Sequence, residues 1–243
     1  TIFGDRFDLG WGGKGANQAA AARLCGAEVA LVARVGADLF GPAIIANLGL
    51  AATFSRSTML NFAKASSAEY RAMGITTALG PQIDLATEPR WLRVDGTFGE
   101  NVELAKTMAK AYVDGSQNTY DKRGRSLGWG SDSINTMIKH WPGDGAGEGG
   151  RESHLNAGKY AVYPGDNFDE HTEPFLAAKN ATAVMSSYSI AIAKDGSPLT
   201  GNRVGSAYDK VKIDLLRDSG YDGVICTDWG VTTGYTDAKD RKS

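Results

Sequence analysis

Cysteine and histidine are scarce in this chain of 243 residues, which has two cysteines and three histidines. Cys25 and Cys226 lie far apart and form no Cys-x-x-Cys pair, so two buried free thiols are favoured over a disulfide framework. The histidines show no recognisable metal-ligand spacing, which argues against a zinc site. We therefore expect neither a metal nor a cofactor.

The chain also lacks a basic block and a long apolar run. Its formal charge of −2 is spread along the sequence, and we expect no nucleic-acid partner. Without a long apolar run we expect no membrane span. The composition, 42% hydrophobic and 22% charged, is ordinary for a globular protein. The length accommodates one large α/β domain or two small ones.

Helical and strand-like patterns alternate along the sequence, which indicates an α/β fold with a mostly parallel sheet. Helices are predicted over residues 15–25, 42–49, 55–73, 100–114, 168–179 and 206–220. Strands are predicted over residues 28–36, 75–84, 134–141, 182–189 and 223–230, the last as a buried strand. Gly115 is expected to end the fourth helix, and the glycine-rich stretches 115–133 and 143–150 are expected to be surface loops.

Reactive or polar side chains stand at the ends of four predicted strands. They are Asp84, the pair Lys139 and His140, the stretch 186–188, and Asp228. Polar residues at the carboxyl ends of successive parallel strands build the active site of a (β/α) barrel. An open doubly wound sheet does the same, so this pattern alone leaves both architectures open.

The stretch GGKGANQ, residues 12–18, poses a separate question because a glycine-rich loop with a lysine can bind phosphate. Here the first glycine and the Ser/Thr of the G-x-x-x-x-G-K-[ST] template are both missing, so a nucleotide loop of that type is excluded. Residues 1–48 closely resemble the N-terminal part of ribokinase and related sugar kinases. That resemblance implies sugar contacts for Gly13, Lys14 and Asn17. The family's catalytic Gly-Ala-Gly-Asp type loop has no counterpart in this chain.

Three longer segments resemble glycoside hydrolase family 3, which includes many β-glucosidases. They are EYRAMGITTALGPQIDLATEPRWLRVDGTFGE, GWGSDSINTMIKHWPGDG and GYDGVICTDWG, and they occur in the family's order. The resemblance covers about four-fifths of the chain, from about residue 48 to the end. It implies a (β/α) barrel and hydrolysis of β-linked glucosides by a retaining mechanism, which needs a nucleophilic carboxylate and a separate proton donor.

The resemblance also implies roles for individual residues. Asp228 occupies the position of the nucleophile, and nearby positive charge or hydrogen-bond donors would have to keep a buried carboxylate ionised there. Lys139, His140 and Arg93 match sugar-binding residues. Asp84 matches a carboxylate that grips sugar hydroxyls.

Two aromatic residues join this predicted site. Tyr188 is expected beside the nucleophile, and Trp229 offers a ring face on which a pyranose can stack. Taken singly, several residues also have plainer interpretations. Asp228 fits a turn or helix cap, Lys139 and His140 fit a strand end that reaches solvent, and Arg93 fits an ion pair with Asp95 or Glu100.

The proton donor is predicted from the stretch RESH. Some members of the family use an Asp-x-His dyad in this loop, and here Glu152, Ser153 and His154 follow that form with glutamate in place of aspartate. A carboxylate beside His154 would raise the imidazole pKa and orient the ring for acid/base work. Exposure of Glu152 and His154 as ordinary loop residues is the alternative.

The two resemblances divide the chain into a ribokinase-like segment, residues 1–48, and a barrel fragment, residues 49–243. The strands that normally precede residue 75 in the barrel are missing, so we expect an exposed sheet edge, which a second copy of the chain is a candidate to cover. Three functions remain open: a β-glucosidase-like hydrolase acting on a small carbohydrate, a ribose-type sugar kinase, and a non-catalytic carbohydrate-binding or chimeric fragment.

Overall fold

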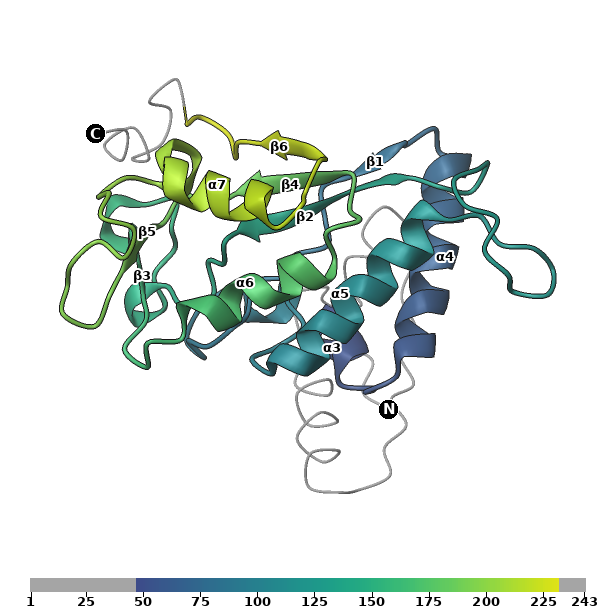
Figure 1. Cartoon of the computed structure of the whole chain (residues 1–243). Helices are drawn as coiled ribbons and strands as arrows, with labels where there is room; N and C mark the ends of the chain where they lie inside the picture. The colour runs from purple at the N-terminus through teal and green to yellow at the C-terminus, as the bar shows by residue number, and fades with distance from the viewer. Residues whose placement is uncertain (1–46, 232–243) are drawn as a thin grey trace, which may run out of the picture.

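The computed structural model describes residues 47–231 (Figure 1). The predictions that lie outside these residues concern the helix at 15–25, the strand at 28–36, Cys25, and the sugar contacts of Gly13, Lys14 and Asn17. Within the described part, α helices alternate with parallel strands, as the sequence predicts. No helix between residues 47 and 231 is both long and apolar enough to cross a bilayer.

Four parallel strands form the main sheet, in the order β1-β2-β4-β6. They are β1 (Thr77–Ala78), β2 (Asn135–Trp141), β4 (Ala183–Ser186) and β6 (Val224–Cys226). A second, two-stranded parallel sheet pairs β3 (Tyr160–Val162) with β5 (Ile190–Ile192). The predicted strands at 134–141 and 182–189 are confirmed, whereas the one at 75–84 shortens to two residues followed by an isolated bridge between Gln82 and Lys139.

Between residues 47 and 231 there are five α helices, most of them gathered on one side of the main sheet (Figure 1). They are α3 (Asn47–Ala51), α4 (Arg56–Ala72), α5 (Val102–Gln117), α6 (Phe168–Ala177) and α7 (Lys210–Asp218). Short 3-10 turns cover Val94–Gly96, Glu148–Gly150, Asn156–Gly158 and Ser206–Tyr208. Helix α5 packs between α4 and α6, and both α5 and α6 contact β2. The apolar core lies in this layer between the helices and the sheet.

Side-chain caps fix where three of the helices begin. Ser55 accepts a hydrogen bond from the Thr58 amide at the start of α4, so the helix begins where the range 55–73 predicts it. Asn101 caps α5 in the same way. Asp209 caps α7, so this helix begins four residues later than predicted and the preceding residues form a 3-10 turn.

The prediction that Gly115 ends the fourth helix is wrong, because α5 continues through it to Gln117. A Cβ atom at Gly115 would lie 2.6 Å from Cβ of Ala63 and 2.8 Å from the carbonyl oxygen of Leu60, both on α4. The glycine therefore serves the close approach of two helices rather than a helix terminus.

Alanine at position 115 is expected to destabilise the protein by about 1–3 kcal/mol, because the added methyl group overpacks the contact between α4 and α5. Gly49→Ala is the matched control, since Gly49 lies in helix α3 and a Cβ atom there meets nothing within 4 Å. Urea denaturation of both variants measures the difference. Equal stability of the two variants would contradict the packing role.

Strand β6 was predicted to be buried, and this is wrong for its first residue. Val224 is 59% exposed, and Cys226, predicted as a buried thiol, is half-buried. Among the described residues β6 pairs only with β4 and therefore forms one edge of the sheet. Within residues 47–231, the side of β6 that faces away from β4 thus has no strand partner.

The stretch 143–150 is also not the surface loop that its glycines predicted, because residues 143–147 are buried. At Gly145 a Cβ atom would lie 2.1 Å from the carbonyl oxygen of Leu85. Only glycine allows the two backbones to approach this closely. The loop after β2 consequently packs against the segment that follows β1, and this contact brings polar residues of both segments together.

Candidate active site

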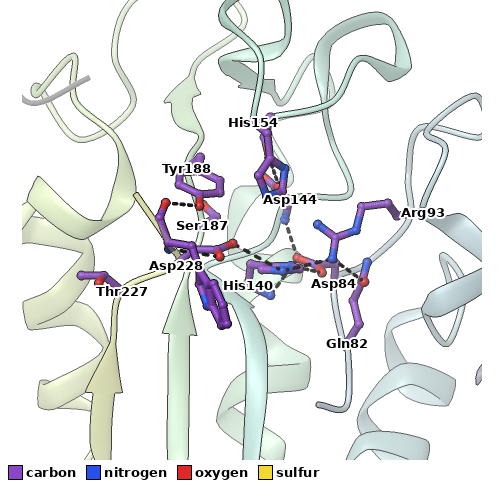
Figure 2. Close-up of polar contacts among 12 residues, drawn as sticks. Gln82, Asp84, Arg93, His140, Asp144, His154, Ser187, Tyr188, Thr227 and Asp228 are labelled. Carbon is purple, nitrogen blue, oxygen red and sulfur yellow. Dashed lines mark hydrogen bonds and ion pairs between the residues drawn. The ribbon is translucent and has the colours of Figure 1, made fainter. Parts of the chain in front are cut away.

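The predicted polar residues converge at the carboxyl ends of the strands of the main sheet. Figure 2 shows Asp84, His140 and Asp228 side by side there, with His154 and Tyr188 close by and Arg93 approaching from the segment after β1. Asp84 follows β1, His140 lies in β2, Tyr188 follows β4 and Asp228 follows β6. The strand-end pattern in the sequence therefore predicts their meeting correctly, because parallel strands place these ends on one edge.

Asp84 lies at the buried centre of the cluster and is inaccessible to solvent. Its Oδ1 accepts hydrogen bonds from the backbone amides of His140 (3.1 Å) and Asp144 (2.7 Å), and its Oδ2 lies 3.0 Å from Nδ1 of His140. Burial alone would raise its pKa. The imidazole and backbone of His140, followed by the guanidinium of Arg93, instead hold the pKa of Asp84 below its ordinary value.

Both oxygens of Asp84 accept hydrogen bonds from the protein, and these contacts orient the ring of His140 and the loop that starts at Asp144. An ionised carboxylate has about four acceptor positions, so these three contacts leave room for a further donor such as a sugar hydroxyl. The role of Asp84 in gripping sugar hydroxyls stays a prediction.

Arg93 extends the cluster away from Asp84. Its Nη2 donates to Oε1 of Gln82 (3.1 Å) and to Nε2 of His140 (3.3 Å). The alternative of an ion pair with Asp95 or Glu100 is therefore not the arrangement found. The guanidinium stands within reach of the same space as His140, where it can donate to a polar ligand.

Lys139 is half-buried at the end of β2. Burial lowers the pKa of its ammonium group, and the charge of Arg93 lowers it further, whereas Asp228 and Asp84 act in the opposite direction. The lysine is therefore close enough to both carboxylates to respond to them. This setting fits a residue of a polar site better than a solvated strand end.

Asp228 stands directly after β6, with its side chain 10% exposed. Its Oδ2 lies 3.9 Å from Nε2 of His140. The neighbouring Trp229 is 62% exposed, and its carbonyl oxygen accepts a hydrogen bond from the hydroxyl of Tyr188. Tyr188 thus lies beside the segment of the predicted nucleophile, as the resemblance implied.

The stretch RESH forms the dyad predicted from its spacing. Oε1 of Glu152 lies 2.5 Å from Nδ1 of His154, and the His154 ring packs edge-on against Tyr188 with 4.6 Å between centroids. The hydrogen bond that His154 donates to Glu152 raises the pKa of His154 against the effect of burial, and the charges of Glu152 and Asp228 add to this rise. The pair is part-buried, so the alternative of two ordinary exposed loop residues does not hold.

The pKa of Glu152 shifts in the opposite direction to that of His154. Burial would raise the pKa of Glu152, but the hydrogen bond and charge of His154 outweigh it and lower that pKa to about 2. Stabilisation through Glu152 is present above its ordinary pKa of 4.5 and is lost as the pH falls toward 2. Stabilisation through His154 is complete below 6.5 and is lost as the pH rises through the raised pKa. The pair therefore stabilises the loop most between about pH 4.5 and 6.5.

Glutamine at position 152 is expected to lower the pKa of His154, because it removes the carboxylate charge and the charge-assisted hydrogen bond and leaves burial unopposed by them. Any activity that needs protonated His154 would then begin to fall at a lower pH on the alkaline side of its pH profile. NMR titration of the His154 ring measures the shift directly. Glu148→Gln, an exposed neighbour in the same loop, is the control and should leave the titration unchanged.

Residues that the sequence reasoning did not single out complete the site. Asp144 donates its amide to Asp84 and accepts hydrogen bonds from the hydroxyls of Ser153 and Ser189. Gln82 holds Arg93. Asp144 stands in the quoted segment KHWPGDG, so a carboxylate just after a functional strand end was the available signal. Between residues 47 and 231, no group of three or more His, Cys, Asp or Glu side chains is placed to hold a metal ion.

An α/β fold with carboxylates, histidines and basic residues at the carboxyl ends of parallel strands defines an enzyme-like, hydrolase-type site. The model of the glycosyl hydrolase family 3 N-terminal domain matches residues 32–242. The chain therefore belongs to glycosyl hydrolase family 3.

Curated relatives agree with this assignment. A periplasmic β-glucosidase/β-xylosidase of Dickeya chrysanthemi is 44% identical over 191 residues, which are 76% of this chain and 28% of that protein. β-Glucosidase C of Emericella nidulans is 42% identical over 191 residues, covering 77% of this chain and 29% of the relative. The chain thus spans less than a third of the length of these relatives.

The chain is also similar to a solved β-glucosidase structure and, over its first residues, to carbohydrate kinases. A β-glucosidase from Listeria innocua in complex with gluconolactone matches with a TM-score of 0.63 and 27% identity, over 82% of this chain and 25% of that one. The model of the pfkB family of carbohydrate kinases matches residues 3–51. Ribokinase of Mus musculus is 52% identical over 48 residues, 20% of this chain and 15% of that protein. The kinase likeness is thus confined to the first fifth of the chain.

Proposed function

We propose that the chain hydrolyses β-linked glucosides with retention of configuration and that Asp228 is the nucleophile. The observation that carries this proposal is the convergence of Asp228, His140 and His154 at one edge of the sheet, with Asp228 Oδ2 3.9 Å from His140 Nε2. A carboxylate that attacks the anomeric carbon must be ionised, and Asp228 lies in a polar site that also holds His140 and the cationic Lys139.

The proton for the leaving oxygen comes in this proposal from His154. Glu152 holds the imidazole by a 2.5 Å contact and raises its pKa, so the ring keeps its proton near neutral pH and can deliver it. In the second half of the reaction the same ring accepts a proton from the attacking water. Both residues of the dyad lie within one loop, which follows the strand that carries His140.

Sugar binding involves the remaining polar and aromatic residues. Arg93 and Lys139 donate hydrogen bonds to sugar hydroxyls, while His140, oriented by Asp84, borders the same space. Trp229 exposes 62% of its surface next to Asp228, which suits stacking of a pyranose face on the indole. The substrate class is a small β-glucoside or a closely related β-glycoside.

The architecture proposed for residues 49–243 is a partial (β/α) barrel, preceded by the ribokinase-like segment 1–48. Support comes from the parallel order β1-β2-β4-β6 and from the site at the carboxyl ends of these strands. The exposed Val224 on the edge strand β6 supports a further contact there, with an additional strand or a second copy of the chain. We propose that such a contact covers this edge.

Proton NMR of the hydrolysis of 4-nitrophenyl β-glucoside by the 243-residue chain tests the function. We expect release of nitrophenol with β-glucose as the first sugar product, because two inversions at the anomeric carbon give net retention. The α anomer as first product would replace the proposed mechanism by an inverting one. Phosphorylation of ribose by ATP without any glycoside cleavage would favour a sugar kinase instead.

A non-catalytic carbohydrate-binding fragment is the second candidate. The observation that favours it is the edge strand β6, on which Val224 is exposed. Under this alternative, glucose raises the melting temperature of the chain but no nitrophenol is released at any pH. Turnover that depends on Asp228 would eliminate it.

A further inference from the structure

Asp144 is a buried carboxyl group to which the proposed mechanism gives no role. It is 2% exposed and lies in the loop after β2. Its backbone amide donates to Oδ1 of Asp84 (2.7 Å), and its two carboxyl oxygens accept hydrogen bonds from the hydroxyls of Ser153 and Ser189. One residue therefore links three segments that are distant in the sequence.

Each of the two serines sits next to a residue of the proton-donor region. Ser153 lies between Glu152 and His154 in the chain, and Ser189 directly follows Tyr188. The His154 ring packs against the Tyr188 ring with 4.6 Å between centroids. The two oxygens of a single carboxyl group thus fix the backbone on both sides of this ring contact.

We propose that Asp144 is a positioning residue that holds the Glu152–His154 loop against Tyr188 and so places His154 over the site of Asp228. This inference rests on the proposed function, because it assigns a use to the position of the proton donor. Asp144 itself touches neither the dyad nor the predicted nucleophile in the contacts described above, and it acts through Ser153 and Ser189.

The backbone of Ser189 is held in turn by a buried lysine. The carbonyl oxygen of Ser189 accepts a hydrogen bond from Nζ of the buried Lys212 (3.2 Å), which also lies 3.7 Å from Oδ2 of the buried Asp209. Burial and the charge of Asp84 both raise the pKa of Asp144. Asparagine has nearly the same shape as aspartate and can hydrogen-bond to both serine hydroxyls, so it should replace Asp144 without displacing its neighbours.

Two substitutions separate the hydrogen bonds of Asp144 from its bulk. Asp144→Asn keeps an acceptor for one serine hydroxyl and supplies an N–H for the oxygen of the other, whereas Asp144→Leu fills the space without either bond. The probe is the NMR chemical shift of the His154 ring protons at constant pH. The His154→Gln variant assigns this resonance, and its chemical shift reports the ring current of Tyr188. We expect Asn to preserve this resonance and Leu to move it toward the value of the unfolded chain.

Turnover of 4-nitrophenyl β-glucoside gives the second readout. Leucine at position 144 is expected to lower kcat by about 10- to 100-fold with KM changed by less than about threefold, because the proton donor is displaced while the sugar contacts remain. Asn should stay within about threefold of the wild-type kcat. Asp222→Leu, at an exposed position, is the matched control and should change neither readout.

An unchanged His154 resonance in a cooperatively melting Asp144→Leu variant would overturn the inference, as would equal losses in the Asn and Leu variants. If the Leu variant does not fold, the double variant Ser153→Ala with Ser189→Ala removes the same two hydrogen bonds. An unchanged His154 resonance in that variant would then overturn the inference. Absence of turnover in the wild-type chain refutes the hydrolase proposal, whereas the resonance still tests the link.

Discussion

Replacing Asp228 with asparagine is expected to reduce the hydrolysis of an aryl β-glucoside by roughly a thousandfold or more, with little change in melting temperature. An amide oxygen is a far weaker nucleophile than a carboxylate, so the glycosyl-enzyme intermediate would form very slowly. The fold should tolerate the change, because the hydrogen bond that Oδ1 of Asp228 accepts from the adjacent Trp229 amide (3.3 Å) can also be accepted by an asparagine oxygen. The measurement is the release of nitrophenol at saturating substrate.

Asp222→Asn is the matched control for this prediction. Asp222 precedes β6 and is exposed, so the same chemical change there should leave turnover unaltered. A loss of turnover in the control equal to that in the Asp228 variant would indicate a general effect on the edge strand. Wild-type turnover by Asp228→Asn would remove the residue from the mechanism.

The second large effect is expected at Asp84, where alanine should destabilise the protein by about 3–5 kcal/mol. The substitution leaves the amides of His140 and Asp144 and the Nδ1 atom of His140 without their common acceptor in a site that solvent does not reach. Unsatisfied buried donors carry their full desolvation cost. Denaturant unfolding monitored by circular dichroism measures the loss.

A stability loss alone would not separate orientation of His140 from simple packing, so Asp84→Asn supplies the comparison. Asparagine keeps its one oxygen for the two backbone amides but presents an N–H group to the imidazole. We expect it to recover most of the stability and still to change the NMR chemical shifts of the His140 ring. Equal stability of the alanine variant and the wild type would contradict the central position given to Asp84.

The helix and strand order could be predicted because it depends on local patterns. A serine at the start, Ser55, and a glycine after the end, Gly74, were enough to predict α4, and the apolar run before His140 was enough to predict β2. The convergence of Asp84, His140 and Asp228 followed from strand ends in a parallel sheet, a rule that needs no knowledge of long-range contacts.

What the sequence reasoning missed depends on contacts between distant segments. Gly115 reads as a helix terminus, and only the neighbouring helix α4 explains why it lies inside α5. The loop at Asp144 reads as exposed because it is polar and rich in glycine, yet Leu85 packs against it and Ser189 bonds to it. The exposure of Val224 likewise depends on what lies beside β6, which no local pattern describes.

The role of Asp84 illustrates the same limit in the site. Its residue type and place at a strand end predict a polar function correctly. Whether its oxygens face a ligand or the protein depends on the backbone of His140 and Asp144, 56 and 60 residues further along the chain. The dyad of Glu152 and His154 was more predictable, because both residues lie within one short loop.

The most direct test of the account is to identify the residue that carries the glycosyl group during turnover. A 2-deoxy-2-fluoro β-glucoside with a good leaving group slows hydrolysis of the covalent intermediate, and intact-mass and peptide analysis then locate the attached sugar. We predict one fluoroglucosyl group per chain, on Asp228. Attachment to another carboxylate, or turnover of the aryl glucoside with no adduct at any residue, would contradict the proposed mechanism.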